Sequence, residues 1–296
     1  MITMGSHEVR LSGATLFYRV RGKGPLLLML AGGHGDADTT DAVCEQLINH
    51  YTVVTYDRRG LSRSTVNLSG ETPTVATHSD DAHHLLAALT GEPSFVFGSS
   101  IGALIGLDLV TQHPGQVRVL VAHEPPVWEL LPDAERDRAI RSLENIVETF
   151  RREGSNAALQ EFTAFAAVDR ADCETDVVLT PPSPQIEANM NFFFTNDALG
   201  VNDFRLDIAA LRGAATRIVA AGGRTSHGSP PRRCAEALAA TLCTTLIECP
   251  GSHMGWLLRP KEFAARLFEV LKEQSVTFDS LRLSPKLDGT HLTLAH

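Results

Sequence analysis

The stretch FVFGSSIGALIGLDL, residues 95–109, runs from a hydrophobic segment into a helical pattern through Gly98-Ser99-Ser100-Ile101-Gly102. The order glycine, any residue, serine, any residue, glycine is weak evidence when it stands alone. It becomes specific when a strand precedes it, a helix follows it, and a base and an acid stand at suitable places along the chain. The flanking segments therefore decide between a reactive serine and a plain glycine-rich loop.

Buried-strand patterns alternate with helical patterns on both sides of this stretch. Apolar runs such as PLLLMLAG (25–32) and YTVVTYD (51–57) are typical of strands covered on both faces. Residues 7–23 alternate apolar and polar residues around Gly13, which predicts an antiparallel hairpin with one solvated face. Further strands are expected at 94–100, 117–125, 216–223 and 244–251, and helices at 37–49, 76–90, 101–114, 230–242 and 260–273. This alternation predicts an α/β fold with a mostly parallel, doubly wound sheet.

The alternation is interrupted between residues 127 and 207. Helical patterns replace strands there, at 133–153, 155–168 and 184–197, and predict a helical lid over the carboxyl ends of the strands. The predicted organisation is a core of residues 7–126 and 208–273, a lid of residues 127–207 and a C-terminal tail of residues 274–296. The initial MITMGSH and the final KLDGTHLTLAH are set aside from this fold prediction.

The composition is that of an acidic globular protein. The 296 residues are 43% hydrophobic and carry a formal net charge of −9, which disfavours nucleic acid or an anionic membrane as the main partner. The five cysteines are scattered without metal-ligand spacing and are expected to be reduced thiols. No signal-peptide pattern occurs, and no apolar run reaches the roughly 20 residues that span a bilayer. We therefore expect a cytoplasmic protein, and a homo-oligomer is compatible with the sequence.

Ser100 stands where a strand pattern ends and a helical pattern begins. Gly98 and Gly102 allow a sharp turn that lifts the serine out of the sheet, and the helix N-terminus offers the N–H of Ile101 to a developing negative charge. A serine hydroxyl also needs a base, a group that orients the base, and oxyanion donors before it can act as a nucleophile. A glycine-rich turn without chemistry remains the alternative at this point.

Four segments together resemble the α/β-hydrolase family over residues 7–273. They are AGGHG (31–35), TYDRRGLSRS (55–64), GSSIG (98–102) and PGSHMG (250–255). The resemblance implies that Ser100 is the nucleophile and His253, in the loop after the last strand, is the base. It also implies oxyanion donors at Ile101 and at Gly33 or its neighbour His34, and a structural turn around Asp57. Serine in the nucleophile position implies acyl transfer without a cofactor.

The acid departs from the commonest arrangement of that family. The segment that follows the strand before the last one, residues 220–237, contains no carboxylate before Glu236, which falls inside a helical pattern. The nearest candidate is Glu124 in VAHEPP, at the end of the strand that follows the nucleophile helix. This position resembles the zearalenone-lactonase-like members of the family, which implies that Glu124 orients His253. The alternative is that Glu124 caps the lid or pairs with an arginine such as Arg224.

Aromatic and apolar residues near these positions predict the walls of a substrate pocket. The candidates are His34, Trp128, Phe193 and Met254. They favour a hydrophobic small-molecule substrate, a carboxylic ester or lactone cleaved through an acyl-enzyme. Two alternatives stay open: a lyase, cyclase or acyl transferase of secondary metabolism with the same site, and a ligand-binding protein without catalysis. No metal-ligand cluster or phosphate-binding motif is present in the sequence, so we expect no metal and no cofactor.

Overall fold

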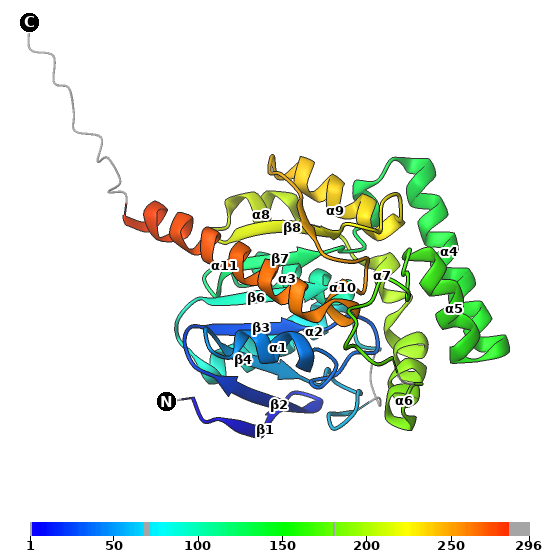
Figure 1. Cartoon of the computed structure of the whole chain (residues 1–296), viewed down its shortest axis with the longest axis horizontal. Helices are drawn as coiled ribbons and strands as arrows, with labels where there is room; N and C mark the ends of the chain where they lie inside the picture. Colours follow the sequence, from blue (N-terminus) through cyan, green and yellow to red (C-terminus); the bar gives the residue numbers. More distant parts are fainter. Residues whose placement is uncertain (1, 68–71, 180, 284–296) are drawn as a thin grey trace, which may run out of the picture.

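A single mixed sheet forms the centre of the molecule (Figure 1). The computed structural model describes residues 2–67, 72–179 and 181–283. Its strands are β1 (Gly5–Leu11), β2 (Ala14–Gly22), β3 (Leu26–Leu30), β4 (Thr52–Tyr56), β5 (Thr65–Val66), β6 (Ser94–Ser99), β7 (Val117–His123), β8 (Arg217–Gly223) and β9 (Ile247–Cys249). They lie in the order β1-β2-β4-β3-β6-β7-β8-β9, and β5 pairs with β2. Pairs that involve β2 are antiparallel and those from β4 to β9 are parallel, which confirms the predicted α/β fold and sheet.

Helices cover both faces of the sheet, which explains why its central strands are apolar throughout. On β3, Leu27 and Met29 belong to one buried cluster together with α1 (Asp41–Leu47) and α11 (Pro260–Leu283). Leu28 and Leu30 belong to a second cluster with α2 (Val75–Leu89), α3 (Ile101–Gln112), α8 (Ile208–Gly213) and α9 (Pro230–Thr241). Successive side chains of one strand thus enter two different cores.

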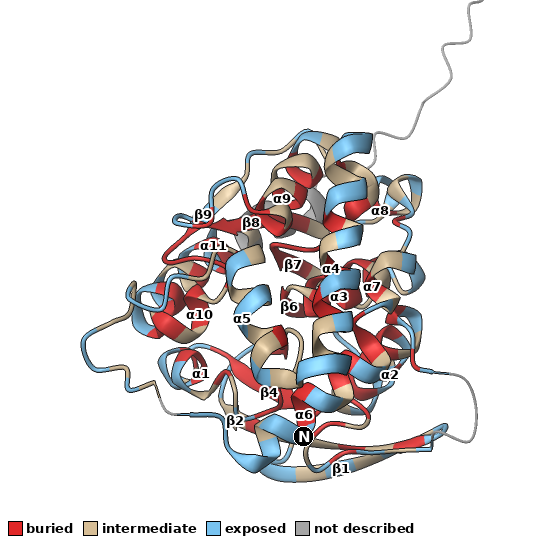
Figure 2. Ribbon diagram, turned by 90° about the vertical axis from the view of Figure 1, so that its right-hand side faces the viewer, coloured by how far each residue is buried: buried red, intermediate tan, exposed pale blue. Residues whose placement is uncertain are grey.

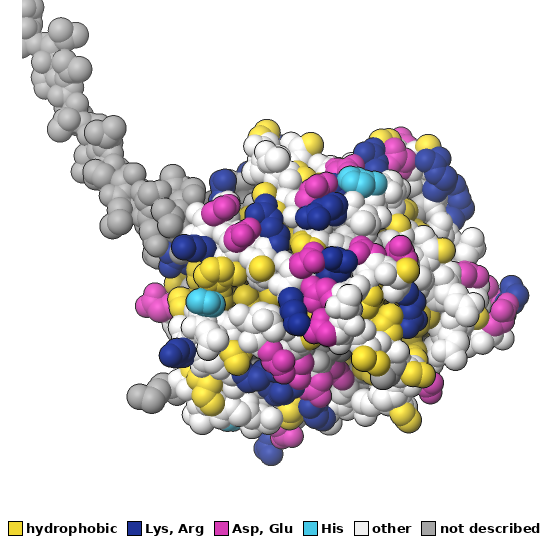
Figure 3. All heavy atoms as spheres, in the orientation of Figure 1, with side chains coloured by type: hydrophobic (Ala, Val, Ile, Leu, Met, Phe, Trp, Pro, Cys, Tyr) yellow, Lys and Arg dark blue, Asp and Glu magenta, His cyan; other side chains and the backbone are white. Residues whose placement is uncertain are grey.

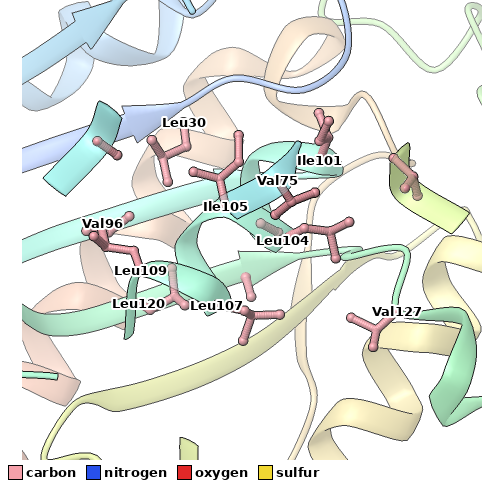
Figure 4. Packing of buried hydrophobic residues seen from close by; sticks show 14 of the residues in the cluster. Leu30, Val75, Val96, Ile101, Leu104, Ile105, Leu107, Leu109, Leu120 and Val127 are labelled. Carbon is pink, nitrogen blue, oxygen red and sulfur yellow. The ribbon is translucent and has the colours of Figure 1, made fainter. Parts of the chain in front are cut away.

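Helix α3 approaches the sheet closely because glycines stand at the contact. A Cβ atom at Gly102 would collide with the carbonyl of Leu30, and one at Gly98 would collide with the carbonyl of Gly102. Figure 4 shows Ile105 of α3 packed beside Leu30 of β3. The helix that follows Ser100 therefore begins directly against the end of β3.

The segment between β7 and α8 is largely helical and lies in front of the strand ends (Figure 2). It contains the 3₁₀ helix η1 (Trp128–Leu130), α4 (Asp133–Glu153), α5 (Ser155–Phe165), α6 (Pro184–Phe192), the π-helix η2 (Phe193–Asp197) and α7 (Gly200–Asp203). The predicted single helix at 184–197 is wrong in detail, because it changes to a π-helix at Phe193. This turn ends at Asp197, which pairs with Arg58 of the core, a tertiary contact that the local pattern does not contain.

Near the two ends of the chain, the limits drawn from the sequence differ from the structure. Strand β1 begins at Gly5, inside the initial segment that had been set aside. Helix α11 continues to Leu283 instead of ending at 273, because no proline or glycine follows until Pro285. The expected tail residues 284–296, with KLDGTHLTLAH, lie outside the described residues. Within the described ranges, no helix combines the length and the apolar character needed to cross a membrane.

The close approach of α3 should make Gly102 sensitive to any side chain. We expect Gly102→Ala to lower the free energy of unfolding by roughly 1–3 kcal/mol, because the added methyl group must displace the backbone of β3. Gly115→Ala is the matched control, since no atom lies within 4 Å of a Cβ built there. Urea unfolding of both variants measures the effect, and equal stability of the two would contradict this account of the packing.

Candidate active site

The candidate site lies where the chain leaves β3 and β6 at their carboxyl ends. After β3 the chain crosses to β4 on one side, and after β6 it crosses to β7 on the opposite side. The two connections therefore diverge between β3 and β6, which is where α/β sheets commonly bind ligands. The loop after β3 carries Gly32 and Gly33, and the turn after β6 carries Ser100. A Cβ atom built at Gly32 would lie 3.2 Å from the Cβ of Ser100, so the two loops are in contact.

Ser100 has a backbone conformation that is rare for a residue with a side chain. Its φ is 56° and its ψ is −124°, and it immediately precedes the first residue of α3. The N–H of Ser100 donates to the carbonyl of His123 at 2.9 Å, which ties the turn to the end of β7. This turn places the serine at the N-terminus of a 12-residue helix, where the N–H of Ile101 can serve an anion.

Glu124 lies 2.7 Å from His253, measured between the carboxylate Oε2 and the ring Nδ1. Glu124 is fully buried, and its φ of 47° turns the chain away from β7 before Pro125 and Pro126. Its other oxygen, Oε1, accepts hydrogen bonds from the backbone N–H of Gly223, at 2.8 Å, and from the hydroxyl of Ser226. These groups, and not Arg224, are the partners of the carboxylate.

The surroundings of Glu124 favour its charged form. Burial alone raises the pKa of the carboxyl, but the hydrogen bond and charge of His253 and the hydrogen bond from Ser226 outweigh burial and lower the pKa to about 2. Glu124 is therefore ionised at neutral pH. A buried carboxylate at 2.7 Å can hold the imidazole of His253 in one orientation and stabilise its protonated form.

The adjacent Ser99 has a different environment from Ser100. It is 2% exposed, and its hydroxyl oxygen accepts a hydrogen bond of 3.0 Å from the indole N–H of Trp256. Trp256 belongs to α10 (Gly255–Leu258), the short helix directly after His253. This contact holds the histidine loop against β6 and distinguishes the two neighbouring serines.

Two further histidines close to the site are neutral at physiological pH. Burial and the nearby Arg58 guanidinium lower the pKa of His34 to about 4. Burial also lowers the pKa of His123 to about 4, and neither of its ring nitrogens has a hydrogen-bond partner among the described residues. Neither ring adds a positive charge that would compete with His253 for Glu124.

Buried side chains hold the loop after β3 from behind. The guanidinium of Arg58 donates to the carbonyl of Gly33 and, at 3.0 Å, to the carboxylate of Asp197 in η2. The amide of Asn189 in α6 donates to the carbonyl of His34 at 3.2 Å. The carbonyl of Gly33 and the N–H of His34 belong to one trans peptide group, so they point in opposite directions. Since Arg58 binds the carbonyl, the N–H of His34 points away from Arg58.

A central cavity of about 70 Å³ joins these groups. Ser100 and His253 both line it, together with the predicted residues Gly33, His34, Phe193 and Met254. The remaining predicted residues, Ile101 and Trp128, line a smaller cavity next to it, which Ser100 also lines. In the described part of the chain, no group of three or more His, Cys, Asp or Glu side chains is placed to hold a metal ion.

Several residues that build the site were missing from the sequence prediction. They are Ser226 and Gly223 beside Glu124, Trp256 beside Ser99, and Arg58 and Asn189 behind the loop after β3. Asn189 lies 155 positions from His34, so no local pattern marks it. Arg58 belongs to the DRRG turn, which the sequence predicts to be structural. Arg58 supports the candidate oxyanion loop by its hydrogen bond to the carbonyl of Gly33.

Glu124 should give the protein a pH-dependent stability. The pKa of the folded carboxyl, about 2, lies below its ordinary value of 4.5, so the unfolded chain takes up a proton first as the pH falls. The stabilisation is complete above pH of about 4.5 and is lost as the pH falls toward 2. We expect the stability difference between wild type and Glu124→Gln, measured by urea unfolding, to shrink by roughly 1 kcal/mol between pH 6 and 3.5. If the stability difference does not change with pH, the carboxyl of Glu124 has the same pKa in the folded and the unfolded chain, which would contradict this prediction.

Comparison with known proteins places this geometry in a family. The family model described as serine aminopeptidase, S33, matches residues 24–165. The uncharacterized hydrolase YraK of Bacillus subtilis (strain 168) is 40% identical over 277 residues, which cover 92% of this chain and 98% of that protein. A thermophilic esterase from Thermogutta terrifontis is similar in structure, with a TM-score of 0.67, 18% identity, and coverage of 91% of this chain and 99% of the esterase. An alpha/beta hydrolase from Sphaerobacter thermophilus has a TM-score of 0.62, 21% identity, and coverage of 90% and 100%. The chain belongs to the α/β-hydrolase family and is a hydrolase.

Proposed function

We propose that this hydrolase cleaves a carboxylic ester or lactone of a hydrophobic small molecule, without a cofactor and through an acyl-enzyme. In this proposal Ser100 is the nucleophile, His253 is the general base and Glu124 orients His253. The observation that carries it is the 2.7 Å hydrogen bond between Glu124 and His253 at the edge of a cavity that Ser100 also lines. A buried carboxylate, a histidine and a serine at a helix N-terminus are the groups that acyl transfer requires.

The reaction begins with a tetrahedral intermediate on Ser100. The free ring nitrogen of His253 takes the proton of Ser100 as Oγ forms a bond to the substrate carbonyl carbon. The resulting oxyanion accepts hydrogen bonds from the N–H of Ile101 and from the loop N–H of Gly33 or His34. The imidazolium lies beside ionised Glu124, which stabilises it.

The second half releases the products. His253 passes the proton to the leaving oxygen, the carbon–oxygen bond of the ester breaks, and the alcohol departs while the acyl group stays on Ser100. A water molecule then loses a proton to His253 and attacks the acyl carbon, and His253 returns the proton to Ser100 as the acid leaves. For a lactone the same steps open the ring and give one hydroxy acid.

The lining of the cavity supports an apolar small molecule as the ligand. Phe162, Phe193, Phe194, Met254 and Leu257 are among its walls. On the face seen in Figure 3, basic and acidic side chains are interspersed, and the formal net charge is −9, so this surface offers little to nucleic acid. The 40% identical relative is named a hydrolase, which favours hydrolysis over the lyase, cyclase, acyl-transferase and ligand-binding alternatives.

Ser100→Ala tests the nucleophile. We expect kcat for ester hydrolysis to fall by a factor on the order of 10³ or more, because the oxyanion donors remain but the attacking oxygen is lost. A fluorophosphonate probe should label wild type at Ser100 and leave Ser100→Ala unlabelled, with peptide mass spectrometry locating the label. Labelling at Ser99 would contradict the assignment, and circular dichroism should show that the variant is folded.

Glu124→Gln tests the acid. This change keeps the shape of the side chain but removes the charge that stabilises the imidazolium, so kcat should fall by a factor on the order of 10²–10⁴. Glu236→Gln is the control: Glu236 pairs with Arg232 and Arg233 on α9, away from His253, and its loss should leave kcat nearly unchanged. Steady-state kinetics of both variants decide, and near-full turnover of Glu124→Gln would place the acid elsewhere.

A further inference from the structure

Three adjoining cavities lie in and beside the candidate site, and Ser100 lines two of them. The central cavity, of about 70 Å³, shares Ser100, Phe162 and Phe193 with a small inner cavity of about 20 Å³. On its other side it shares His34, Thr39, Leu159, Met254 and Leu257 with an outer cavity of about 420 Å³. A substrate therefore finds little space on the inner side of the central cavity and much more on the outer side.

The inner cavity is apolar and small. Apart from Ser100, its lining is entirely hydrophobic: Ile101, Pro126, Trp128, Leu143, Phe162, Phe165, Phe193, Val201 and Pro231. The single polar atom of Trp128 is already used, because its indole N–H donates to Asn202 at 2.9 Å. Since one water-sized probe needs about 10–15 Å³, the inner cavity holds a methyl or ethyl group and little more.

The outer cavity is large and mostly apolar. Its hydrophobic walls come from the segment before α6, from α5 and α6, and from the residues after His253: Leu159, Val168, Val177, Val178, Leu179, Pro181, Pro182, Ile186, Met254, Leu257 and Leu258. Its charged residues are Asp38, which is paired with Arg19 and Arg63, and Arg170. Because hydrophobic side chains form most of the remaining wall, the outer cavity fits an extended or bulky apolar group.

The chemistry fixes which half of an ester each cavity receives. His253 must reach the leaving oxygen to protonate it, so the alcohol half has to lie on the side of His253. Met254 and Leu257, which follow His253, line both the central and the outer cavity. The inner cavity contains Ser100 and the oxyanion residue Ile101 but not His253, so it receives the acyl half.

We infer that the substrate is an ester of a short acyl group, acetyl or propionyl, with a bulky apolar alcohol. The inference rests on the proposed function, because it uses Ser100 and His253 in their proposed roles. Ser100 Oγ bonds to the short acyl group, the ester bond to the alcohol breaks, and His253 carries the serine proton to the alcohol. Water then releases acetate or propionate, so only water is consumed.

Octyl acetate and ethyl octanoate provide a direct test, because they are isomers that differ only in which half carries the long chain. We expect kcat/KM for octyl acetate to exceed that for ethyl octanoate by at least about tenfold. An equal or reversed ratio overturns the inference. If the probe labels Ser100 but octyl acetate is not cleaved, the inference about the substrate is overturned and the assignment of Ser100 as the nucleophile stands. If the probe does not label Ser100 and octyl acetate is not cleaved, the proposed function itself is overturned.

Leu143→Ala tests the assignment of the inner cavity. Leu143 is a buried residue of α4 that lines this cavity, so its truncation should lower the preference for octyl acetate over ethyl octanoate by roughly tenfold. Ile146→Ala is the matched control, because Ile146 is equally buried on α4 but is not part of the inner lining, and the preference should stay as in wild type. Val201→Ala, a smaller truncation in the same cavity, serves if Leu143→Ala does not fold. An unchanged preference in the folded inner-cavity variant overturns the assignment.

Discussion

The close contact of α3 with the end of β3 is the constraint on which the site depends. Glycine at positions 98 and 102 removes the Cβ atoms that would collide with backbone carbonyls, and so the helix can begin directly beside the sheet. The turn between β6 and α3 then has no room for an ordinary conformation, and Ser100 adopts a positive φ. The same contact brings the first N–H groups of the helix next to the loop after β3, so the serine and both candidate oxyanion segments meet at one point.

Glu124, the proposed acid, lies one strand away from the end of β8, which is crowded. A Cβ atom at Gly223 would lie 2.6 Å from backbone atoms of Ser252, in the histidine loop, and one at Gly222 would lie 2.6 Å from the side chain of Arg232. The two glycines that end β8 therefore have no space for a side chain, and the next three residues, Arg224, Thr225 and Ser226, are not carboxylates. Strand β7 lies directly beside β8, with His123 paired to Ala221, and its continuation delivers Glu124 to the same histidine from one strand away. The N–H of Gly223 contributes a hydrogen bond to the carboxylate instead.

Much of this arrangement could be predicted from the sequence because its determinants are local. The central strands are apolar on both faces, the serine stands between a strand and a helix, and the segment 220–237 has no carboxylate before Glu236 to compete with Glu124. The supports of the site could not be predicted in this way. Arg58 and Asn189 act through contacts with residues far away in the chain, and Asp197, where the π-helix ends, is paired with the distant Arg58. The predicted end of the last helix at 273 is wrong because no proline or glycine stands there to stop the helix before Pro285.

The helices that cover the site also hold part of it in shape. Asn189 of α6 fixes the carbonyl of His34, and Asp197 of η2 fixes Arg58, which in turn fixes the carbonyl of Gly33. Any displacement of α6 and η2 that widened access to the cavity would break both attachments together. The covering helices and the candidate oxyanion loop are therefore joined, so the contacts that keep α6 and η2 in place also keep that loop in place.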